Sequence, residues 1–180
     1  MKTVIVICLF LGAFHSNLFG QKYVLEKSSV SFYSHAPVED IEAYSVEGNS
    51  IIDLETGDMV FSIPIRSFQF EKGLMQEHFN ENYMESHKFP NATFSAVAFD
   101  WVPFKGEMEI SVGGDFNVHG KTNRMEITGQ MLVEANRVVI DAEFEVAIAN
   151  HAIKVPKALF YNIAEVIKVT IHFEYKPFEK

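Results

Sequence analysis

Cysteine, tryptophan and basic charge are scarce in this chain of 180 residues. It has one cysteine, Cys8, and one tryptophan, and 15 Lys and Arg stand against 24 Asp and Glu, for a formal net charge of −9. Because Cys8 lies in the N-terminal apolar run, the rest of the chain has no thiol for a disulfide bond, a metal site or a nucleophile. An acidic chain without a basic stripe argues against nucleic acid and anionic lipid headgroups as partners.

The N-terminus has the order of a secretory signal peptide. Lys2 precedes an apolar run over residues 4–14, and the small residue Gly20 follows. The run is too short to span a bilayer comfortably, so we do not expect the protein to span a membrane. We expect cleavage of residues 1–20, a single domain over residues 21–180, and a periplasmic or secreted location.

Most of the chain beyond residue 21 alternates apolar and polar residues with a period of two, as half-buried strands do. In residues 58–68, for example, Met59, Phe61 and Ile63 share one face and Ser62 lies on the other. This pattern predicts eight strands, over residues 23–33, 44–54, 58–68, 92–101, 107–119, 125–133, 138–148 and 167–175. The irregular residues 151–164 are expected to form a loop packed on the sheet.

Short turns separate several of these runs and predict antiparallel hairpins. Residues 55–57, 119–122 and 135–137 each lie between two alternating runs. One face of each strand is apolar and the other charged, and closing such a sheet removes its unpaired edges. The sequence therefore predicts an all-β protein, a single eight-stranded antiparallel β-barrel.

One stretch departs from the strand pattern. Over residues 74–84, apolar residues recur at spacings of three to five, closer to helical periodicity, and Pro90 follows Phe89 soon after. We expect a short helical lid over residues 74–84 that covers one end of the barrel. His78 lies on its apolar face, as a polar group at the entrance or as a structural side chain.

Phenylalanine and methionine are abundant, with 17 and seven copies. A barrel lined by Phe and Met accommodates a flexible apolar guest without directional bonds, and each buried methylene contributes about 0.8 kcal/mol. Gly114 and Gly129 lie in phase with the apolar rows, where a missing side chain leaves room. The alternative is that these residues interdigitate as an ordinary core, and composition alone favours that alternative.

Two segments resemble the YceI-like family. Residues 114–125, Gly-Asp-Phe-Asn-Val-His-Gly-Lys-Thr-Asn-Arg-Met, resemble its G-x-L-T-I-H-G-V-T-type strand–turn–strand signature. Glu77-His78-Phe79, Tyr83, Phe89-Pro90 and Thr93-Phe94 resemble the family's acidic-x-His-Leu, aromatic and Tyr-Pro-x-x-x-Phe block. Near the start, residues 32–41 depart from the His-Met-rich segment of many members, which leaves the identity of the ligand open.

The resemblance implies an extended, lipocalin-like barrel with an elongated apolar pore, in the bacterial periplasm. It implies a non-enzymatic carrier or sequestering protein for a long amphiphilic lipid, such as an isoprenoid, a quinone or a fatty-acid-like molecule, with no other cofactor. A homodimer is possible. On this basis the expected ligand-binding residues are Phe32, His35, Phe61, Ile65, His78, Phe79, Phe94, Phe116, Val118, Phe144 and Ile171.

Catalytic and metal sites find little support in the sequence. His78 and His87 lie near Glu77, Glu81 and Glu85, but their spacing matches no compact metal motif. No Gly-x-Ser-x-Gly elbow is present, so we predict neither a catalytic nor a metal site. Two alternatives remain open: an envelope hydrolase or isomerase that uses Glu77 and His78 as an acid–base pair, and a ligandless interaction module of the envelope.

Overall fold

A computed structural model describes residues 22–35, 40–154 and 164–179 of the chain. The predicted signal peptide and most of the predicted loop over residues 151–164 lie outside these residues.

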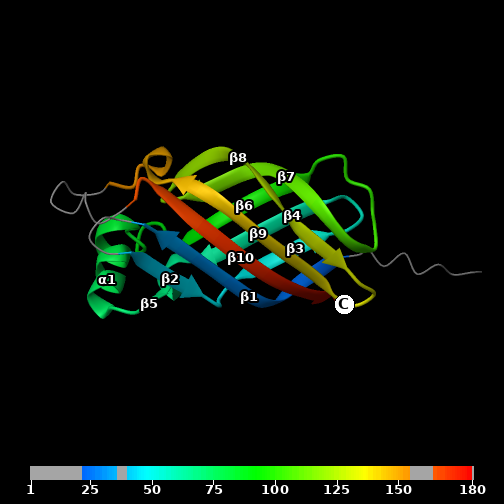
Figure 1. The fold of residues 1–180 in the computed structure, drawn as a ribbon, viewed down its shortest axis with the longest axis horizontal. Helices are drawn as coiled ribbons and strands as arrows, with labels where there is room; N and C mark the ends of the chain where they lie inside the picture. Colours follow the sequence, from blue (N-terminus) through cyan, green and yellow to red (C-terminus); the bar gives the residue numbers. More distant parts are fainter. Residues whose placement is uncertain (1–21, 36–39, 155–163, 180) are drawn as a thin grey trace, which may run out of the picture.

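The described chain folds into one curved sheet of β-strands with a short helix at one end (Figure 1). The first strand and the last lie side by side, and the start of β1 and the end of β10 lie at the end of the barrel opposite the helix. The elements are β1 (Lys22–Ser34), β2 (Ile41–Ser45), β3 (Asn49–Asp53), β4 (Asp58–Pro64), η1 (Ile65–Ser67), β5 (Gln69–Phe70), α1 (Gly73–His78), η2 (Phe79–Tyr83), β6 (Asn91–Ala98), β7 (Gly106–Val118), β8 (Lys121–Val133), β9 (Val138–Ala147), η3 (Ile148–His151) and β10 (Val166–Pro177).

The sheet closes into a barrel of eight strand positions. Strands β6 to β10 pair in chain order, and β10 pairs antiparallel with β1 to close the ring. β2 and β3 share one register along β1, since Val30 pairs with Ser45 and Lys22 with Asp53. They are one strand position interrupted at residues 46–48, and β5 continues β4 beyond η1. The predicted eight-stranded antiparallel barrel is confirmed.

All three predicted hairpins are present, and the strand bounds differ where local chemistry interrupts the ladder. The predicted strand over residues 58–68 ends at Pro64, which has no amide hydrogen for the ladder, and the one-turn helix η1 follows. In the 119–120 turn, both His119 and Gly120 have positive φ, as a two-residue type I′ turn requires. At Gly120 a Cβ atom would also lie 2.5 Å from the Phe89 ring.

The predicted lid is confirmed as a helical segment, although not as a single α-helix. α1 gives way at Phe79 to η2, a π-helical segment in which the amide of Met84 donates to the carbonyl of Phe79 (2.8 Å). Met75 from α1 and Phe79 and Tyr83 from η2 face the barrel interior. Leu74, near the start of α1, points outward with 64% of its surface exposed.

The two halves of the barrel interior differ in packing. In the half away from α1, where β1 begins and β10 ends, Ile52, Met131, Val138 and Tyr175 are all completely buried. The Tyr175 hydroxyl of β10 shares a hydrogen bond of 3.0 Å with Ser50 Oγ of β3, past the intervening strand β1, so both buried polar groups have a partner. This half is a solid core, and burial raises the pKa of Tyr175 far above its ordinary value.

The expectation that Gly114 and Gly129 leave room for a guest was wrong, because both glycines lie against the backbone of a neighbouring strand. A Cβ atom on Gly114 would lie 2.1 Å from the carbonyl oxygen of Ser95 on β6, and one on Gly129 would lie 2.6 Å from that of Asp141 on β9. Both glycines allow neighbouring strands to approach closely. Gly114 does not line the cavity described below, and Gly129 does.

Candidate ligand-binding cavity

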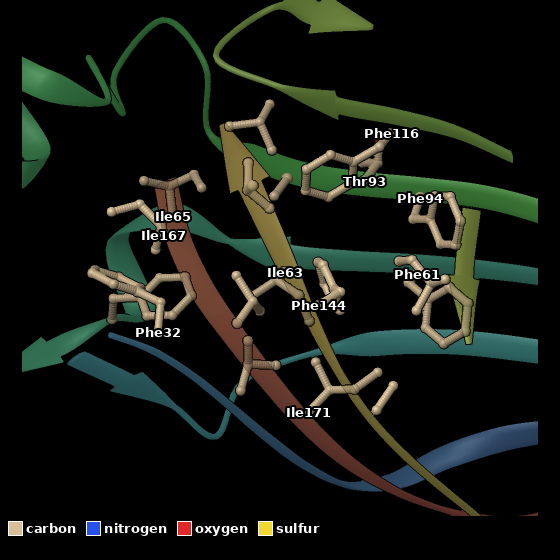
Figure 2. A pocket seen from close by; sticks show the side chains of 18 of the residues that line it. Phe32, Phe61, Ile63, Ile65, Thr93, Phe94, Phe116, Phe144, Ile167 and Ile171 are labelled. Carbon is tan, nitrogen blue, oxygen red and sulfur yellow. The ribbon is translucent and has the colours of Figure 1, made fainter. Parts of the chain in front are cut away.

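An apolar cavity of about 230 Å³ occupies the half of the barrel next to α1. Its walls are side chains from all eight strand positions, so the cavity exists only because the sheet closes. In Figure 2 the side chains of Phe61, Phe144 and Ile171 reach into the same space from β4, β9 and β10. The lining is almost wholly hydrocarbon.

A chain of aromatic contacts forms one side of the cavity. Phe61 stacks on Phe173 at 5.7 Å and on Phe94 at 6.1 Å between ring centroids. Phe94 meets Phe116 edge-on at 6.2 Å, and Phe116 meets Phe144 at 6.4 Å. Register explains the order, because Phe61, Phe94 and Phe116 are direct partners on β4, β6 and β7. Five rigid rings from five strands hold this wall in shape.

A second aromatic cluster closes the end at the lid. Phe79, the first residue of η2, stacks on Phe32 of β1 at 5.5 Å and lies 4.9 Å from Phe70 and 5.8 Å from Phe68. The helical segment is therefore held onto the barrel by one ring packed among three others. Met75 and Met84 line the cavity from the same segment, and their flexible side chains adapt to irregular guests.

The burial pattern shows that this half of the barrel is hollow. Phe61, Phe144 and Ile171 point inward, yet each retains accessible surface, unlike Ile52 or Met131 in the solid half. Interior side chains of a fully packed protein leave few voids larger than a water molecule. An apolar void of this size offers water no hydrogen-bond partners, so a hydrocarbon guest fits it better than water does.

The few polar groups at the cavity are already satisfied or lie at its rim. Ser34 Oγ accepts a hydrogen bond of 2.8 Å from the amide of Ala164. Tyr83 lines both the apolar cavity and a neighbouring polar pocket, whose other walls are Asn82, Glu85, His119, Ala152 and Lys154. Apolar and polar binding surfaces thus meet at one residue of the lid.

Glu85 organises this polar pocket. Its carboxylate binds Lys88 and lies 3.2 Å from Nε2 of His119, whose Nδ1 lies 3.1 Å from the main-chain carbonyl of His151. The hydrogen bond from Lys88, and then that from His119, hold the pKa of Glu85 below its ordinary value of 4.5, although partial desolvation acts the other way. The carboxylate ties the lid to the β7–β8 turn.

Acid is expected to weaken this tie. A carboxyl group with a lowered pKa in the folded protein stabilises it above the unfolded-state pKa, and that contribution is lost as the pH falls through the folded-state pKa. Glu85→Gln is therefore expected to lower the urea unfolding midpoint at pH 7, and the gap from wild type should close as the pH falls below the ordinary carboxyl pKa of 4.5 and through the lowered folded-state pKa of Glu85. Glu81→Gln, at an exposed position of the same segment, is the control. A gap independent of pH would contradict this role.

The structure places nine of the eleven expected ligand-binding residues on the cavity wall: Phe32, Phe61, Ile65, Phe79, Phe94, Phe116, Val118, Phe144 and Ile171. The other two do not line it. His35 is exposed and pairs with Asp40 at 2.7 Å, and His78 lies half-buried at the end of α1. Glu77 beside it is exposed. That any of these residues binds a ligand remains a prediction.

Several lining residues were not among those expected. Ile110, Val112, Ile140 and Phe173 lie on the inward rows that alternation identifies, so the sequence contained a signal for them. No such sequence signal marks Phe68 and Phe70, because η1 breaks the alternation between them and β4. Among the described residues, no group of three His, Cys, Asp or Glu side chains is placed to hold a metal ion.

A sequence model of the YceI-like domain matches residues 23–175, which is nearly the whole barrel. The chain belongs to the YceI-like family. The resemblance seen in the two sequence segments is thereby confirmed, and the family's barrel is the fold described above. None of the helices in the described part of this YceI-like chain has the length and apolarity needed to cross a bilayer.

Solved structures of similar fold are distant in sequence. A polyisoprenoid binding domain from Saccharophagus degradans, implicated in plant cell wall breakdown, superposes with a TM-score of 0.74 at 14% identity, over 87% of this chain and 98% of that one. Burkholderia cenocepacia BcnA superposes with a TM-score of 0.69 at 15% identity, over 82% of this chain and 95% of that one. The Campylobacter jejuni YceI protein has a TM-score of 0.66 at 11% identity, over 81% of this chain and 90% of that one. No curated protein matches this YceI-like chain.

Proposed function

We propose that this protein is a non-enzymatic binding protein that carries or sequesters an amphiphilic lipid of isoprenoid, quinone or fatty-acid-like type. The observation that carries the proposal is the apolar cavity of about 230 Å³ between the aromatic wall and the lid. The similar domain from Saccharophagus degradans, described as polyisoprenoid binding, supports the class of ligand. The N-terminal apolar run supports a periplasmic or secreted location.

The lid end supports an amphiphile rather than a plain hydrocarbon. A tail inside the cavity would leave its polar head near Tyr83, which also lines the polar pocket. There Glu85, His119 and Lys154 supply both donors and acceptors. In this arrangement the headgroup contacts lie around Glu85 and His119, and neither His78 nor His35 is needed for them.

The enzyme alternative has less support. Its acid–base pair, Glu77 and His78, does not line the cavity. A substrate whose tail fills the cavity therefore has no contact with that pair along the cavity wall. The ligandless interaction module requires a filled interior, and the lid half of the barrel is hollow. A binding role uses the apolar cavity, which is present in the half next to α1 and absent from the solid half.

Native mass spectrometry tests the proposal. Protein purified from the cell envelope of its source is expected to carry an adduct of lipid mass that organic extraction removes. The extracted protein is then expected to retain added prenyl and alkyl amphiphiles in a one-to-one ratio. Protein that carries no adduct and retains none of the added amphiphiles would contradict the proposed function. Conversion of an added amphiphile into a product would favour the enzyme instead.

A further inference from the structure

The cavity is blind, because it ends on a floor inside the barrel. On β10 the lining includes Phe173 but not Tyr175, and on β9 it includes Ile140 but not Val138. Tyr175 and Val138, one inward position further along each strand, are completely buried. Met59, Val112 and Ile127 complete the floor from β4, β7 and β8. A chain that enters from the lid end has no exit at the other.

Phe173 is the aromatic centre of this floor. Its side chain is 2% exposed and stacks on Phe61, at 5.7 Å, on the cavity side. On the other side it meets the Tyr175 ring edge-on at 6.4 Å. The hydrogen bond between Tyr175 and Ser50 fixes that ring in turn. The floor is therefore backed by a hydrogen-bonded, fully packed layer that has no room to yield.

The cavity volume limits the length of chain that it encloses. An apolar cavity of about 150 Å³ holds one benzene molecule, or about 25 Å³ per carbon atom. On this scale the 230 Å³ cavity holds about nine carbon atoms. A polyprenyl chain of about 40 carbons would need roughly 1,000 Å³ on the same scale.

We propose that Phe173 acts as a stop that limits the enclosed hydrocarbon to about ten carbon atoms, so that the ligands are amphiphiles with a single medium-length tail. This inference rests on the proposed function. A ten-carbon acyl chain or a tail of two isoprene units fills the cavity with its end against Phe173. Further carbons of a longer chain lie outside the wall and add little to binding.

A series of alkyl chains with one headgroup tests the limit. The probes are n-alkyl maltosides with 6 to 16 carbons, each titrated into lipid-extracted protein below its micelle-forming concentration. Each methylene group that enters the cavity is expected to tighten binding about fourfold. The affinity should rise to about ten carbons and then level off. A rise that continues steadily to 16 carbons would overturn the length limit and leave the binding function standing, whereas no binding by any chain would overturn both.

Phe173→Ala tests the stop itself. Removing the phenyl ring deepens the cavity by about six carbon atoms, so the affinity should level off at about 16 carbons instead of ten. The matched control is Leu54→Ala, a buried position in the solid half outside the cavity lining, which should keep the wild-type profile. An unchanged profile in a folded Phe173→Ala protein would show that Phe173 is not the stop.

A second variant tests the same limit from the wall and does not remove a core ring. Ala142 lines the cavity from β9 and pairs with Gly129 on β8. Ala142→Leu adds three carbon atoms inside the cavity, and the affinity should then level off about three carbons earlier than in wild type. A profile that stays at ten carbons in this variant would overturn the volume argument.

Discussion

Replacing Ala142 with phenylalanine is expected to weaken the binding of a ten-carbon amphiphile by at least about 1,000-fold. The added ring occupies most of the space that about nine carbons need, so some six methylene groups of the guest lose their place. At about 0.8 kcal/mol for each buried methylene, the loss is about 5 kcal/mol. The fold should tolerate the change, because Ala142 lines the cavity and the new ring extends into that void instead of overpacking a filled core.

Isothermal titration calorimetry of the lipid-extracted protein measures this loss. The matched control is Glu143→Phe, which adds the same ring at the next residue of β9, on the exposed outer face. The control should bind as wild type does. If the two variants bind equally well, the guest does not occupy the barrel interior.

The two halves of the barrel are expected to respond differently to the same substitution. Ile52 is completely buried in the solid half, and Ile171 lines the cavity. Ile52→Ala should lower the free energy of unfolding by about 4 kcal/mol, because it creates a new void in a packed core. Ile171→Ala should cost only about 2 kcal/mol in the ligand-free protein, because it enlarges a void that is already there and loses fewer contacts.

Urea denaturation of both lipid-extracted variants beside wild type gives these values. A saturating ten-carbon amphiphile should raise the unfolding midpoint of the Ile52→Ala protein as much as that of wild type. It should raise that of the Ile171→Ala protein less, since this variant loses a contact with the guest. Equal costs for the two substitutions would contradict a hollow half, because equally packed isoleucines should cost the same.

The barrel could be predicted from the sequence because apolar and polar residues alternate with a period of two along its strands. Phe61, Phe94 and Phe116 each lie in an alternating run, and short turns bring such runs together in register. The aromatic wall then follows from which face is apolar. The lid could also be predicted, since residues 74–84 depart from that period.

The sequence does not distinguish the solid half of the barrel from the hollow half. Ile52 and Ile171 have the same side chain and the same inward phase, and only the three-dimensional packing leaves one in a core and the other beside a void. The π-helical turn at Phe79 has no simple sequence signal. The sequence neighbours of His78 indicate an entrance group there, whereas Glu85 and His119 meet only after folding.

A crystal structure of the lipid-extracted protein under xenon pressure tests the central claim most directly, since xenon enters dry apolar cavities. The account predicts xenon density inside the barrel between Phe61, Phe144 and Ile171, above an intact Phe173 floor, and none near Tyr175. An interior without xenon, with these side chains packed together across the space, would contradict it.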